Sequence, residues 1–109
     1  MAFFSANPTA TGGTTSIVAA SAGRQARFLA FGYSNDTATR VTLRIYDGTV
    51  ASGTLRVRIS LAPGDNNYIF NPFSGGSIFP KSWWSSGNAI QCDLDGAGSV
   101  FLFGDVVQE

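Results

Sequence analysis

The 109-residue chain contains no histidine, and this absence excludes several kinds of active site. Histidine is the commonest general base, the usual partner of a catalytic serine or cysteine, and a frequent zinc ligand. The single cysteine, Cys92, allows neither an intrachain disulfide nor a thiolate metal cluster. Because Cys92 is in phase with Ile90 and Leu94, we expect it to lie in the core. The sequence therefore predicts no enzyme, no catalytic or metal-binding residues and no cofactor.

Acidic residues are also few, and they do not form a convincing catalytic pair. Six aspartates lie beside turn signals or near expected strand ends, and the seventh acidic residue is the terminal Glu109. Asp93 and Asp95 have the spacing of some calcium loops, but the other acidic ligands of such a loop are missing. A hairpin turn is the preferred interpretation of residues 95–98.

Charged residues make up only 13% of the chain, and the net charge is zero. Ordinary soluble domains have about 25% charged residues. The shortage suggests that a partner covers part of the surface, while the zero balance gives no footprint for nucleic acid. No apolar run approaches the ~18 residues of a membrane-spanning helix. Residues 1–5 lack the features of a signal peptide, so we expect synthesis in the cytoplasm and no membrane partner.

Alternation of apolar and polar residues predicts an all-β protein. Residues 40–46 and 55–61 alternate with a period of two, which is typical of half-buried antiparallel strands. Turn signals separate them from other short apolar runs, and residues 88–94 and 99–107 are expected to pair as a hairpin. Seven or eight such strands predict a single-domain antiparallel β-sandwich, jelly-roll-like, over residues 15–109.

Residues 1–14 differ from the rest because they are small, polar and rich in glycine. This composition is typical of a flexible N-terminal arm. Phe3 and Phe4 at its start are candidates to dock on a neighbouring subunit or on the surface that the protein binds. A disordered terminus is the alternative.

Three features indicate an interface. Arg44, Arg56 and Arg58 are expected to point outward, where arginine without lysine suits interfacial ion pairs, although a solvated face is the alternative. Residues 28–33 and 100–103 are apolar on both faces, whereas a two-layer sandwich buries only one face of each sheet. The cover could be the arm, a long loop or another subunit. We expect a subunit, and hence a homo-oligomer, with a trimer favoured.

The third feature is a concentration of aromatic residues between residues 68 and 84. Trp83 and Trp84, flanked by serines and preceded by Phe79, suit either a protein interface or stacking on sugar rings. A crossover loop whose aromatic side chains pack on the core is the alternative.

The chain as a whole resembles small β-sandwich proteins of tailed bacteriophages, particularly capsid decoration or cement proteins. The likeness lies in the Met-Ala arm, the strands rich in Arg, Thr, Val and Ile, the turn at residues 61–64 and the closing segment 88–107. It implies a jelly-roll-like trimer on the virion surface that binds the major capsid protein or another virion protein and stabilises the shell. Small tail or baseplate proteins share these features, and a carbohydrate-binding module is a further alternative.

Overall fold

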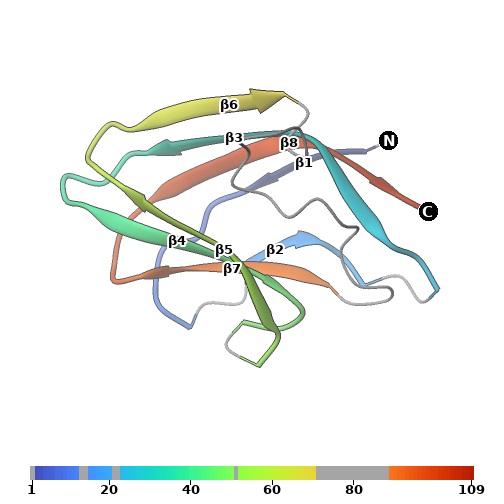
Figure 1. Ribbon diagram of the computed structural model, residues 1–109. Coiled ribbons are helices and arrows are strands. Elements are labelled where there is room, and N and C mark those ends of the chain that lie inside the picture. Colours follow the sequence, from blue (N-terminus) through green and yellow to red (C-terminus); the bar gives the residue numbers. More distant parts are fainter. Residues whose placement is uncertain (1, 13–14, 21–22, 51, 71–88) are drawn as a thin grey trace.

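The computed structural model describes residues 2–12, 15–20, 23–50, 52–70 and 89–109. These residues form eight strands in two antiparallel four-stranded sheets (Figure 1). Sheet A has the order β1-β8-β3-β6, and sheet B has the order β2-β7-β4-β5. The strands are β1 (Ala2–Ala6), β2 (Thr15–Val18), β3 (Ala26–Asn35), β4 (Val41–Asp47), β5 (Thr54–Leu61), β6 (Asn66–Phe70), β7 (Ile90–Asp95) and β8 (Val100–Gln108). This is the strand order of a jelly roll, so the predicted sandwich is confirmed.

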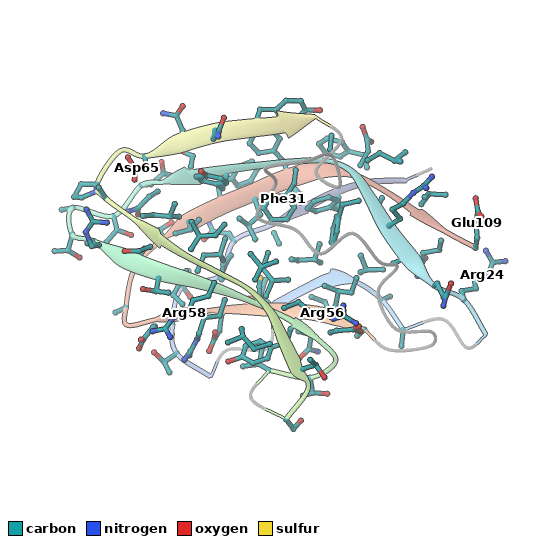
Figure 2. The ribbon with its side chains drawn as sticks, in the orientation of Figure 1. Arg24, Phe31, Arg56, Arg58, Asp65 and Glu109 are labelled. Carbon is teal, nitrogen blue, oxygen red and sulfur yellow. The ribbon has the colours of Figure 1, made fainter. Side chains whose placement is uncertain are left out.

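The core lies between the two sheets, and period-two alternation supplies most of it. In β4, Leu43 and Ile45 are fully buried, as the alternation predicted. In β3, Phe28 and Phe31 are both buried although they lie three positions apart, because a β-bulge between Phe28 and Ala30 shifts the phase. Figure 2 shows Phe31 between the sheets. Of residues 28–33, expected to be apolar on both faces, both phenylalanines therefore face the core, while Leu29 is half-buried.

The start of the chain is part of the sandwich. Ala2–Ala6, expected to belong to a flexible arm, instead form edge strand β1 beside β8. Phe4 is only 6% exposed, and its ring lies 5.5 Å from that of Phe28 and 5.7 Å from that of Phe31. Phe4 is therefore a core residue and is not displayed for docking, whereas its neighbour Phe3 faces outward.

Residues 8–12 are held against the connection between β7 and β8. The carbonyl oxygens of Thr9 and Ala10 accept hydrogen bonds from the backbone N–H groups of Gly98 and Leu94, at 3.0 and 3.3 Å. The Thr11 hydroxyl accepts another from the Gly96 N–H at 2.7 Å. Small side chains allow two backbones to approach this closely. The small, polar composition of residues 8–12 therefore suits a packed segment and does not indicate a flexible arm.

β7 and β8 follow each other in the chain but do not form the predicted hairpin. β7 pairs with β2 and β4 in sheet B, whereas β8 pairs with β1 and β3 in sheet A. The short connection with Gly96 (φ 110°) thus crosses from one layer to the other. Both strands carry apolar residues at alternate positions, and this pattern is the same whether two strands share a sheet or face each other across a core.

Asn35 fixes the place where the chain passes from β5 to β6. Its side chain is 2% exposed, and Nδ2 donates to the carbonyl oxygens of Leu61 and Ala62 at 3.2 and 2.9 Å. Its Oδ1 accepts from the Thr37 N–H at 2.9 Å. These bonds join the β3–β4 and β5–β6 connections, and so they position β6 at the edge of sheet A.

Candidate functional site

Exposed aromatic side chains gather on the outer side of sheet A. Phe3 is 73% exposed, Tyr68 47% and Phe101 41%. They come from β1, β6 and β8, and Phe3 and Phe101 alternate with the buried Phe4 and Leu102. Together with the partly buried Phe103 they form a surface that we call the aromatic face.

Phe103 is the centre of the aromatic face. Its ring stacks on Tyr68, with centroids 5.7 Å apart and planes 13° apart, and on Phe101, at 5.8 Å and 27°. Gly32 lies directly between Phe103 and Tyr68 in the register of the sheet. A Cβ atom at Gly32 would lie 2.3 Å from Cζ of Phe103, so the ring occupies the space that a side chain there would take. Gly32 thus permits the stack.

An open pocket of about 420 Å³ borders this stack. Six residues line it, and one of them, Tyr33, also packs against the core: Tyr33, Ser34, Asn66, Asn67, Tyr68 and Phe103. No Asp, Glu, Lys or Arg is among these six residues. Concave apolar sites with a few polar groups at the rim are typical of places where proteins bind a partner group. The arrangement can therefore receive an aromatic or other apolar group.

The outward arginines of sheet B lie in a different environment from the one expected. Arg44 makes a bidentate ion pair with Asp93 of the same chain, Nε to Oδ1 at 2.9 Å and Nη2 to Oδ2 at 2.7 Å. The Gly12 N–H donates to the same carboxylate at 2.8 Å. The hydrogen bonds of Arg44 to Asp93, together with the negative charge of that carboxylate, raise the pKa of the Arg44 guanidinium above its ordinary value. Asp93 is only 1% exposed, and both Arg44 and Gly12 donate hydrogen bonds to its carboxylate.

Of the other two candidate arginines, one has a carboxylate partner within the chain and one is exposed. Arg56 pairs with the buried Asp47 at 3.3 Å, whereas Arg58 is exposed and lies opposite Arg44 in the register of β4 and β5. Arg44 and Arg56 thus have carboxylate partners within the chain. Because its partner Asp93 is buried, we expect replacement of Arg44 to destabilise the fold.

The aromatic face was only partly visible in the sequence. Phe3 was identified, and Phe101 and Phe103 lie in the segment predicted to be apolar on both faces. The contact between Tyr68 and Phe103 was missed because the residues are far apart in sequence and β6 and β8 lie on either side of β3. Phe79, Trp83 and Trp84 lie outside the described residues.

Two features of the described part of the chain bear on reactivity: the thiol of Cys92 and the spacing of possible metal ligands. Burial, together with the negative charge of Asp93, raises the pKa of the Cys92 thiol to about 12. Within these residues, no three His, Cys, Asp or Glu side chains come close enough to hold a metal ion. The described segments also contain no helix with the length and apolar character needed to cross a membrane.

Cys92 should resist alkylation as long as the protein is folded. The thiol is buried and neutral, and only the thiolate reacts rapidly. We expect no labelling by iodoacetamide at mildly alkaline pH and complete labelling after unfolding in guanidinium chloride, measured by mass spectrometry. Labelling of the native protein at the rate of a free thiol would contradict the burial of Cys92.

Comparison of the chain with protein-family models, with curated proteins and with solved structures finds no match.

Proposed function

We propose that the protein is a homo-oligomeric structural protein of a tailed-phage virion, of the capsid decoration type, and that it associates through the aromatic face. The observation that carries the proposal is the exposure of Phe3, Tyr68 and Phe101 on one side of sheet A. Aromatic residues are enriched at the centres of protein interfaces, so several exposed aromatic side chains on one side of a sheet favour an interaction surface there.

The composition supports the same proposal. With 13% charged residues, the chain has little charge with which to keep a large surface in water. A small domain also buries a smaller fraction of its surface on folding than a large one, so an oligomer adds stability. The jelly-roll fold itself does not choose the function, because viral capsid proteins and lectins both use it. The resemblance to decoration proteins favours the virion surface and a capsid protein as the partner.

The experiment is to analyse particles produced by the genome that encodes the chain. We expect mass spectrometry to find the protein in the DNA-filled heads after heads and tails are separated on a density gradient. Its presence only in the tail fraction would assign it to the tail or baseplate, which is the nearest alternative. Its absence from both fractions would overturn the virion proposal.

A carbohydrate-binding module remains the alternative from a different class. The sequence evidence for sugar binding is the pair Trp83 and Trp84, which lies outside the described residues. Within the described residues, the pocket beside Tyr68 offers aromatic and amide groups that could contact a sugar. A glycan array distinguishes the two proposals. A monomer that binds a defined sugar would favour the module, whereas an oligomer that binds none supports the structural protein.

A further inference from the structure

Phe3 and the pocket beside Tyr68 lie on the same sheet but at opposite edges. β1, which carries Phe3, is one edge of sheet A, and β6, which carries three of the pocket residues, is the other (Figure 1). Three strand spacings of about 4.8 Å separate these edges, roughly 14 Å in all. Phe3 is 73% exposed, so it does not fill the pocket of its own chain.

We propose that Phe3 of one subunit inserts into the pocket of the next subunit, so that the chains form a head-to-tail ring. This proposal rests on the homo-oligomer proposed above and names the contact that builds it. A protruding group and a receiving pocket at opposite ends of one surface form a heterologous contact. Repeated contacts of this type close into a ring when the rotation between neighbours allows it.

In a ring of three, edge β1 of one subunit meets edge β6 of its neighbour at each corner. The outer sides of the three A sheets then turn toward the threefold axis. This arrangement brings the side that bears Phe3 toward the side that bears Tyr68 on the next chain. Since Phe103 lines the pocket and stacks on Phe101, the inserted Phe3 contacts the ring at the centre of the aromatic face.

The chemistry of the pocket favours Phe3 as its occupant. A phenylalanine side chain fits well within about 420 Å³, and the stacked rings of Tyr68 and Phe103 offer edge-to-face contacts at the usual 4.5–7 Å. The lining has no charged side chain that would lose its hydration on insertion. Among the described residues, Phe3 is the most exposed large hydrophobic residue. An aromatic anchor in a neighbour's pocket is the typical hot spot of a protein interface.

The test uses variants that each lack one half of the contact. Phe3→Ala removes the protruding group, and Tyr68→Ala removes one wall of the pocket. Each change should weaken the subunit contact about 30-fold or more, so that sedimentation velocity shows smaller species at concentrations where the parent is a trimer. The control is Leu55→Ala on β5 of sheet B, which removes another exposed apolar side chain, 44% exposed, and should leave the trimer intact.

Mixing the two variants tests the head-to-tail geometry. Phe3→Ala keeps an intact pocket, and Tyr68→Ala keeps the protruding Phe3, so one contact can form between them but no ring can close. We expect 1:1 dimers in the mixture at concentrations where each variant alone is monomeric. Asn66→Trp, which fills the pocket from an exposed position, replaces Tyr68→Ala if circular dichroism shows that the latter is not folded.

The outcomes separate this proposal from the one on which it depends. If Phe3→Ala assembles like the parent, the ring contact is overturned while the homo-oligomer stands, and the pocket belongs to another occupant. If the mixture contains no dimer, the head-to-tail geometry is overturned. If the parent itself is monomeric, the homo-oligomer and the ring fail together.

Discussion

Replacing Arg44 with alanine should destabilise the protein by about 3 kcal/mol. Removing one partner of a buried ion pair costs about 3–5 kcal/mol, because the remaining charge stays buried without compensation. Asp93 is 1% exposed, but Arg44 is 21% exposed, so water can partly replace the guanidinium and the lower end of the range applies. Equilibrium unfolding in urea, at a protein concentration where the parent is monomeric, measures the change.

Two further variants establish the cause. Arg58→Ala, at the exposed position opposite Arg44, should change the free energy of unfolding by no more than about 0.5 kcal/mol. Adding Asp93→Asn to Arg44→Ala should recover part of the lost stability, because it neutralises the buried carboxylate. Equal stabilities of Arg44→Ala and Arg58→Ala would mean that the pair with Asp93 contributes nothing to the fold.

Phe4→Ala should have the second large effect, a loss of about 3–5 kcal/mol. The substitution leaves a cavity next to Phe28 and Phe31, whose rings pack on Phe4. Its neighbour Phe3 faces water, so Phe3→Ala should leave the stability of the monomer almost unchanged. Comparing the two unfolding midpoints in guanidinium chloride tests the assignment of β1 to the sandwich. Similar midpoints for both variants would contradict the assignment of β1 and would support a flexible N-terminal arm instead.

Local patterns predicted the parts of the fold that depend on neighbouring residues. The alternation correctly placed Leu43 and Ile45 of β4 and Val57 of β5 in the core, and the phase of Cys92 with Ile90 and Leu94 correctly placed it there. It was wrong for Leu55, which is 44% exposed, and for Tyr46, which is buried, because the register shifts between Ile45 and Tyr46. Turn residues correctly separated most strands. All of these features follow from a period of two and from local turn chemistry, which the chain carries within a few residues.

The errors concern relations between distant segments. The pairing of Arg44 with Asp93 depends on β4 and β7 lying side by side, and their separation in sequence hides it. The polar composition of residues 8–12 is the same for a loose arm and for a segment bonded to the β7–β8 connection. The stack of Phe103 on Tyr68 likewise depends on β3, which lies between β6 and β8 and places Gly32 between the two rings. Strand alternation cannot show which sheet a strand joins.

Sedimentation equilibrium of the purified parent protein tests the central claim, that the aromatic face joins copies of this chain. We expect a mass close to three times the 11.5 kDa of the single chain at micromolar concentration. We also expect a shift toward the monomer in Phe3→Ala but not in Leu55→Ala. A parent protein that sediments as a monomer across the micromolar range would show that the aromatic face does not join copies of this chain.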